Sequence, residues 1–150
     1  MTQKRSQRMK KLVDIETKVV QPLLSTFKSE QVNQQQQQQA LGDLLGYRDE
    51  YSARFKAKGG AGVSSFQMQD FQCFLQKLDD AIAQQRQALV LTEQRLQTAK
   101  GAWQQAQQRV DALQKVTEKS EVEERATDRK YVQRQLEERF GLSQAEAYTS

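Results

Sequence analysis

The chain has 150 residues, of which 37% are hydrophobic and 28% are charged, and its formal net charge is +4. It contains no His and a single cysteine, Cys73, which excludes His-based acid–base catalysis, His metal ligands and an internal disulfide. No apolar stretch approaches the roughly 20 residues that span a bilayer, and the basic N-terminus lacks the apolar core of a signal peptide. We therefore expect a cytoplasmic protein from a reducing compartment.

The first helix is expected over residues 3–57. Gln is a good helix former, so the run Gln34–Gln39 is interpreted as helix with a polar contact stripe rather than as a prion-like segment. Pro22 lacks an amide hydrogen, and we expect it to kink or loosen the helix. The apolar side chains recur at coiled-coil spacing: Leu12, Ile15, Val19, Leu23, Phe27, Leu41, Leu44, Tyr51 and Phe55.

A glycine-rich loop over 58–63 is predicted to separate two helices. It follows a helix and lacks the Gly-Lys-Ser/Thr ending of a phosphate-binding loop, so we interpret it as a structural turn. Ser64 and Gln67 have the spacing of a capping box, in which each side chain accepts a hydrogen bond from a free backbone amide. The second helix is therefore expected over 64–140, with a tail over 141–150.

The second helix has a more regular stripe, whose strict period of 3.5 residues predicts a left-handed coiled coil. Steps of four and three pick out Phe71, Leu75, Leu78, Ile82, Gln85, Leu89, Thr92, Leu96, Ala99, Trp103, Ala106, Val110 and Leu113. The stripe then becomes polar, and we expect that part to be held less tightly. It continues through Thr117, Ser120, Glu124 and Thr127, before apolar groups return at Tyr131, Leu136 and Phe140.

These elements predict an all-α fold, a long antiparallel two-helix coiled-coil hairpin that forms a single domain over 1–150. A short loop makes consecutive helices antiparallel neighbours. One end of the hairpin then carries the loop. The other end carries both termini, with the start of the first helix near Asp111 to Glu121 and the second helix continuing alone beyond it.

Two surfaces are candidates for protein binding. The first is the basic start of the chain, which contains Lys4, Arg5, Arg8, Lys10 and Lys11. It is either a solvated helix end paired with acids of the second helix or a docking site for a protein partner. We do not expect it to bind nucleic acid, because no aromatic residues interleave with the basic ones.

The second surface lies near the loop, where several large apolar residues stand outside the coiled-coil stripe. They form either a local aromatic plug or an exposed binding patch. These residues are Tyr47, Phe66, Met68 and Phe74.

The acidic residues of the second helix are interpreted as a solvated face, because no His, Cys or fixed pocket accompanies them. They are Glu121, Glu123, Glu124 and Asp128. We expect no catalytic residue, no metal ligand and no cofactor, and therefore no enzyme.

One stretch of the sequence resembles a known family. The pattern Tyr47-x-x-x-Tyr51, a glycine-rich turn, and the segment from Phe71 to Gln85 are similar to the FliJ family of flagellar type III export proteins. Glu50 and Trp103 also stand where members of that family have them. The resemblance covers nearly the whole chain and is most specific between Leu41 and Trp103.

The resemblance implies a cytoplasmic export component, associated with the inner membrane at the flagellar base only through protein partners. Members of the family form an antiparallel coiled coil similar to the central stalk of rotary ATPases. They are implied to bind the export ATPase hexamer and promote its assembly, and to contact the cytoplasmic domain of the export gate. They are also described as chaperones or escorts for export chaperones and substrates.

The resemblance also implies which residues make these contacts. The gate contact would comprise Leu44, Tyr47, Tyr51, Phe74, Leu78, Ala81 and Gln85, the last where some members carry His. The ATPase contact would lie in Met1 to Leu24 and Val116 to Phe140. Its residues would include Lys4, Arg5, Arg8, Lys10, Lys11, Leu12, Ile15 and Tyr131.

Two other functions stay open from the sequence. One is the equivalent stalk protein of a virulence type III secretion system, which shares the architecture. The other is a general coiled-coil scaffold with no ATPase partner. A scaffold should self-associate, whereas we expect an intramolecular hairpin to be a monomer when free.

Overall fold

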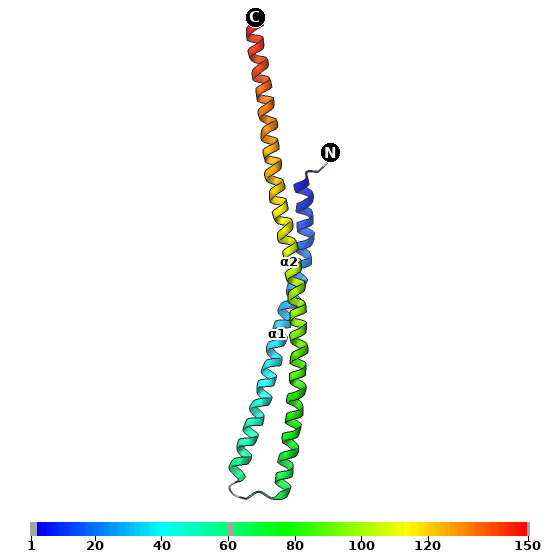
Figure 1. Ribbon diagram of the computed structural model, residues 1–150, viewed down its shortest axis with the longest axis vertical. Coiled ribbons are helices and arrows are strands. Elements are labelled where there is room, and N and C mark those ends of the chain that lie inside the picture. Colours follow the sequence, from blue (N-terminus) through cyan, green and yellow to red (C-terminus); the bar gives the residue numbers. More distant parts are fainter. Residues whose placement is uncertain (1–2, 60–61, 150) are drawn as a thin grey trace. The chain divides into compact units, whose positions relative to one another are not determined.

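A computed structural model describes residues 3–59 and 62–149, which form two long helices (Figure 1). Helix α1 is Arg5–Gly59 and helix α2 is Ser65–Thr149, and no strand occurs in the described part of the chain. The all-α prediction is therefore confirmed, with two helices that pack along each other.

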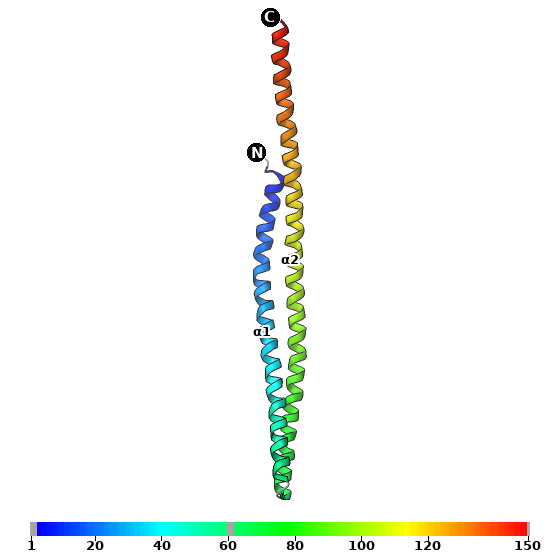
Figure 2. The ribbon, with the colours of Figure 1, turned by 90° about the vertical axis from the view of Figure 1, so that its left-hand side faces the viewer.

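The contacts divide the chain into two units, each made of one piece of α1 against one piece of α2 (Figure 2). Unit 1 comprises Met1–Val20 and Gln105–Ser150, and unit 2 comprises Gln21–Gln104, which includes the loop. The single-domain organisation stays a prediction, and the two units are described in turn.

The turn between the helices lies in unit 2. Gly62 has a φ of +85°, a conformation that glycine adopts without steric cost, while residues 60 and 61 of the predicted loop lie outside the described part. The capping box is confirmed. The Ser64 amide donates to Gln67 Oε1 at 3.2 Å, and the Gln67 amide donates to Ser64 Oγ at 3.2 Å.

The helices continue past a proline and a glycine, and the kink expected at Pro22 stays a prediction. Helix α1 remains helical on both sides of Pro22, and the Thr26 hydroxyl donates to the Pro22 carbonyl at 3.0 Å. Helix α2 continues through Gly141 to Thr149, where the sequence predicted a tail. One glycine costs a helix only about 1 kcal/mol, and the alanines that follow have the highest helix propensity.

The predicted stripe of α2 is confirmed by burial. Its members from Phe71 to Glu124 are all buried or half-buried, whereas Thr127 is exposed. In unit 2, Trp103 stacks on Phe27 with the ring centroids 5.5 Å apart. The most buried members along α2 are Ile82, Thr92, Leu96, Val110, Thr117 and Ser120.

The predicted stripe at the start of α1 is wrong by one residue. Leu12, Ile15 and Val19 are 44%, 57% and 46% exposed. The side chains that face α2 in their place are Ser6, Met9, Val13, Glu16 and Val20. Stepping back from Phe27 by four and three residues leads to this second set, so a continuous heptad along α1 determines which side chains are covered.

The glutamine run forms the polar contact stripe that the sequence predicted. Gln85 of α2 donates through Nε2 to Oε1 of Gln37 at 2.7 Å and to its backbone carbonyl at 3.0 Å. Gln34 donates to the carboxylate of Glu93. The helices are therefore joined here by hydrogen bonds that glutamine side chains donate.

Candidate protein-binding surfaces

An aromatic cluster joins the two helices of unit 2 near the loop. The ring of Tyr51 lies 5.3 Å from that of Phe71 and 4.4 Å from that of Phe74, and Phe55 stacks on Phe71 at 3.8 Å. Tyr51, Phe55 and Phe71 are half-buried, so they form the plug between the helices.

The rim of this cluster is exposed. Tyr47 is 60% exposed and Phe74 is 45% exposed. Two of the predicted gate-contact residues, Tyr51 and Phe74, are thus brought into ring contact, with Tyr47 one helical turn before Tyr51. The cluster contains both a plug and an exposed aromatic patch, the two alternatives that the sequence left open.

The other predicted gate-contact residues are less accessible. Leu44, Leu78, Ala81 and Gln85 are all half-buried. The Gln85 side-chain amide is already engaged by Gln37 of α1. These four residues are therefore less exposed than Tyr47 and Phe74.

A salt bridge beside the aromatic cluster was missed by the sequence analysis. Arg48 Nε donates to Asp79 Oδ1 at 2.6 Å, and this hydrogen bond raises the pKa of the Arg48 guanidinium. Arg48 occupies a contact position of the α1 heptad, three residues before Tyr51. A cation at a position that normally holds an apolar residue was the signal in the sequence, since it requires an acidic partner on α2.

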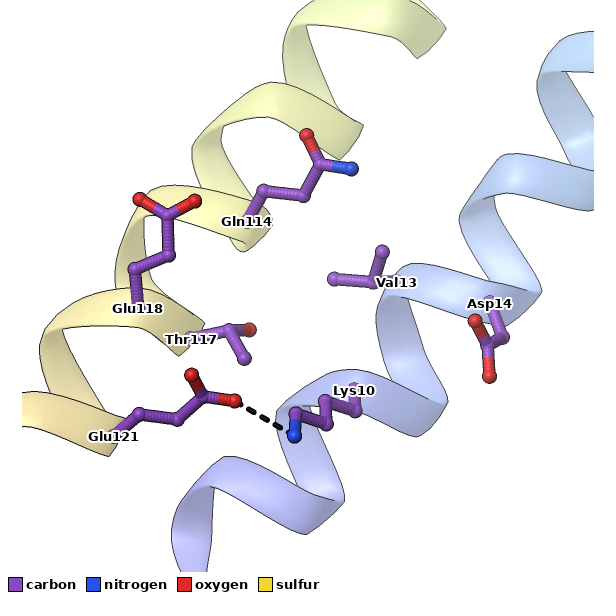
Figure 3. Close-up of a pocket in the computed structure, with 7 residues that line it drawn as sticks. All are labelled: Lys10, Val13, Asp14, Gln114, Thr117, Glu118 and Glu121. Atoms are coloured by element: carbon purple, nitrogen blue, oxygen red, sulfur yellow. Dashed lines mark ion pairs between the residues drawn. The ribbon is translucent and has the colours of Figure 1, made fainter. Parts of the chain in front are cut away.

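In unit 1, residues at and just before the start of α1 pair with acids of α2. Lys4 Nζ lies 3.1 Å from Asp128 Oδ2, and Lys10 Nζ lies 2.7 Å from Glu121 Oε1 (Figure 3). Glu121 lies at the end of the expected range Asp111 to Glu121, and Asp128 lies beyond it. Glu121 is half-buried in this pairing, whereas Asp128 remains exposed, as expected for a solvated face.

Ser6 makes the closest polar contact of this pairing. Its amide donates to Glu124 Oε1 at 3.0 Å and its hydroxyl donates to Glu124 Oε2 at 2.6 Å. These two hydrogen bonds to the charged form lower the pKa of Glu124. A serine and a glutamate thus occupy facing contact positions that an apolar pair fills in most coiled coils.

The face of α1 next to the covered stripe, one residue out of phase with it, is exposed in unit 1. Arg5, Arg8, Leu12, Ile15 and Val19 follow one another at steps of three and four, which places them on one helix face. All five are exposed, and neither arginine has an ion-pair partner among residues 3–59 and 62–149. We call these five residues the cationic–apolar face.

The predicted ATPase-contact residues are therefore divided among different surroundings. Arg5, Arg8, Leu12 and Ile15 belong to the cationic–apolar face, whereas Lys4 and Lys10 pair with α2. Lys11 is exposed. Tyr131 is 62% exposed on α2, and its hydroxyl accepts a hydrogen bond from Gln135 at 2.7 Å. Residues 1 and 2 of the predicted contact lie outside the described part.

Figure 3 shows the groove beside the Lys10–Glu121 ion pair. It holds about 430 Å³ between the two helices of unit 1, with Asp14 and Glu118 on its walls. The Thr117 hydroxyl donates a hydrogen bond to the Leu113 carbonyl at 2.7 Å. Within the described residues, no group of three or more His, Cys, Asp or Glu side chains is placed to hold a metal ion.

No described helix is long and apolar enough to span a lipid bilayer. Paired helices joined along a heptad stripe, with large apolar and cationic side chains left exposed, are typical of coiled-coil proteins that bind other proteins. That is the class of protein that the fold and its surfaces define.

The family follows from comparison with known sequences. The model of the family described as "Flagellar FliJ protein" matches residues 5–144, and the chain belongs to the FliJ family. It is therefore a component of flagellar protein export, and the family is not known as an enzyme family.

Two curated relatives agree with this assignment. The chain is 29% identical over 104 residues to the Flagellar FliJ protein of Escherichia coli strain K12, and 27% identical over 104 residues to that of Salmonella typhi. Each alignment covers 69% of this chain and 71% of the relative. No solved structure matches the chain significantly.

Proposed function

We propose that this protein is a coiled-coil stalk and adaptor of flagellar type III export, which binds the export ATPase hexamer and promotes its assembly. The observation that carries the proposal is the cationic–apolar face of unit 1. Three large apolar side chains that α2 leaves uncovered lie next to two arginines that have no ion-pair partner in the described part of the chain. This is the composition of a protein-docking face.

The same protein would contact the cytoplasmic domain of the membrane export gate through the aromatic patch of unit 2. Exposed aromatic residues on a rigid support often supply most of the binding energy of an interface. Tyr47 and Phe74 are exposed, while the stacked rings of Tyr51, Phe55 and Phe71 hold their backbone in place.

The proposed adaptor acts in the cytoplasm and reaches the inner membrane only through its protein partners. In that position it would also escort export chaperones and their substrates. The family match favours the flagellar system over the virulence-type stalk.

The ATPase proposal is tested by measuring the hydrolysis rate and the hexamer fraction of the organism's flagellar export ATPase, with and without the full chain. We expect the wild-type chain to raise both. Leu12→Glu combined with Ile15→Glu should lower the stimulation at least tenfold, because two carboxylates replace apolar contacts on the docking face.

Val32→Glu is the matched control, since Val32 is 53% exposed on α1 but lies in unit 2. It should stimulate as the wild type does. The same stimulation by the wild type and the Leu12/Ile15 variant would assign the contact elsewhere, and no stimulation by any chain would refute the stalk proposal.

A further inference from the structure

The aromatic patch of unit 2 has a neighbour on α2 toward the loop. Phe66, Asp70 and Phe74 follow one another at steps of four, which places them along one ridge of the helix. Phe66 is 72% exposed, more than Tyr47 or Phe74, and it makes no ring contact with another described residue. Its ring therefore adds exposed apolar surface two helical turns from Phe74, roughly 12 Å along the axis.

The start of α2 fixes the backbone of Phe66. The capping box joins Ser64 and Gln67 on either side of it, and the Met68 amide donates to the Ser64 carbonyl at 3.0 Å. Because this turn is already ordered, a partner that covers the ring loses little affinity to ordering the backbone. Each Å² of apolar surface that the partner removes from water then favours binding by roughly 25 cal/mol.

The end of α1 makes this end of unit 2 positive. Residues 51–70 contain three cations, Arg54, Lys56 and Lys58, and a single carboxylate, Asp70. Arg54 lies two helical turns after Tyr47, which places both on one face of α1. It is exposed, and no ion pair joins it to another described residue. The surface therefore complements an apolar partner surface that carries carboxylates.

We infer that Phe66 is a further residue of the gate contact, which extends from Tyr47 and Phe74 to the loop end of unit 2. The inference rests on the proposed contact with the cytoplasmic domain of the export gate. That domain would cover the Phe66 ring with apolar side chains and place a carboxylate within reach of Arg54. A second copy of this chain is a poorer occupant, because it would bring two positive ends together.

Phe66 would also determine the orientation of the bound domain. Tyr47 and Phe74 lie on different helices at one level of the hairpin, so a partner anchored by these two rings alone could tilt along the helices. A third ring, two helical turns closer to the loop, removes that freedom. Phe66 is thus a specificity residue as well as a source of binding energy.

The test is calorimetric titration of the full-length chain with the purified cytoplasmic domain of the export gate. Phe66→Ser should weaken binding at least tenfold, as expected for an aromatic anchor. Met68→Ser is the matched control, because Met68 is 42% exposed in the same turn but lies about 200° around the helix from Phe66. Urea unfolding verifies that both variants are as stable as the wild type.

A charge reversal tests the role of Arg54. Arg54→Glu should weaken binding, and the loss should shrink as the salt concentration rises from about 50 to 300 mM. Lys56→Glu is the control, since Lys56 is exposed in the same part of α1 but lies about 200° around the helix from Arg54. Equal losses for the two variants would mean that net charge, and not the position of Arg54, affects binding.

The outcomes separate this inference from the proposed function. Weaker binding by Tyr47→Ala together with wild-type binding by Phe66→Ser would overturn the inference and leave the gate contact in place. A wild-type chain that does not bind the domain would refute both. Sedimentation of the chain alone tests the other occupant, and a dimer that Phe66→Ser dissociates would assign the ring to self-association instead.

Discussion

Tyr47 and Tyr51 are separated by one turn of α1 but have different roles. Tyr51 stacks on Phe71 between the helices and contacts the tilted ring of Phe74, whereas Tyr47 is 60% exposed at the rim. The sequence placed both tyrosines in the predicted gate contact. A family resemblance indicates which positions make a contact, but not which of these side chains are exposed. Ring contacts distinguish the residue that holds the surface in place from the residue that is available to a partner.

Substitution by alanine should separate these two roles. Tyr51→Ala removes a half-buried ring from the plug and should lower the free energy of unfolding by about 2 to 3 kcal/mol. Tyr47→Ala should change it by less than about 0.5 kcal/mol, since the ring is exposed. In contrast, Tyr47→Ala should weaken binding of the export-gate cytoplasmic domain at least tenfold.

Urea unfolding and calorimetric titration measure the two quantities. Val32→Ala, at an exposed site elsewhere on α1, is the control for both. A Tyr47 variant that binds the gate domain as tightly as wild type would remove this tyrosine from the proposed contact.

The contact between Ser6 and Glu124 predicts a pH dependence. Because the pKa of Glu124 is lowered in the folded chain, the unfolded chain binds more protons at this site over the pH range between the two pKa values. The stabilisation of the folded chain by the Ser6–Glu124 contact is therefore complete above the ordinary carboxyl pKa. It is lost as the pH falls through the lowered pKa of Glu124.

Unfolding by urea at several pH values between 7 and 2.5 measures this effect in wild type and Ser6→Ala. The variant lacks the hydroxyl that donates to Glu124, so its stability should fall less on acidification. Parallel curves for the two proteins would mean that Ser6 does not lower the pKa of Glu124.

At the scale of the element, the two helices differed in how well the sequence predicted them. In α2, apolar residues follow a single register from Phe71 to Leu113, and this register is the one that is covered. In α1, Val13 and Val20 form one stripe while Leu12, Ile15 and Val19 form another, one residue out of phase. Helical periodicity alone does not choose between two such stripes, because either one makes the helix amphipathic.

The choice depends on contacts with the other helix, which no local pattern contains. Ser6 bonds to Glu124, and Glu16 lies 3.8 Å from Arg109, so polar residues of the covered stripe have partners on α2. The Arg48–Asp79 salt bridge was missed for the same reason. The resemblance supplied the candidate contact residues but not which of them are accessible.

Adjacent valines of α1 test the corrected register. Val20 is 5% exposed and Val19 is 46% exposed. Val20→Asn places an amide in a buried position and should lower the free energy of unfolding by about 2 kcal/mol. Val19→Asn should lower it by less than about 0.5 kcal/mol. Thermal unfolding of the two variants decides the register, and equal losses would reject it.

At the scale of the whole molecule, each part of the fold rests on contacts between two helices only. No described side chain is completely buried, since every contact layer is bounded by water on both sides. Each contact layer pairs one position of α1 with one position of α2, so stability increases with the number of paired layers rather than with the depth of a core.

The polar contact layers of unit 1 determine where the helix pair opens first. Ser6, Thr117, Ser120 and Glu124 occupy the positions nearest the start of α1, where the first opening of the helix pair costs least. We expect the two helices to separate and pair again repeatedly at these layers, while they remain paired at the apolar layers beyond. A partner that binds the cationic–apolar face therefore stabilises the start of α1 in its paired state. Part of the binding free energy is used to order this end of the helix, which lowers the observed affinity.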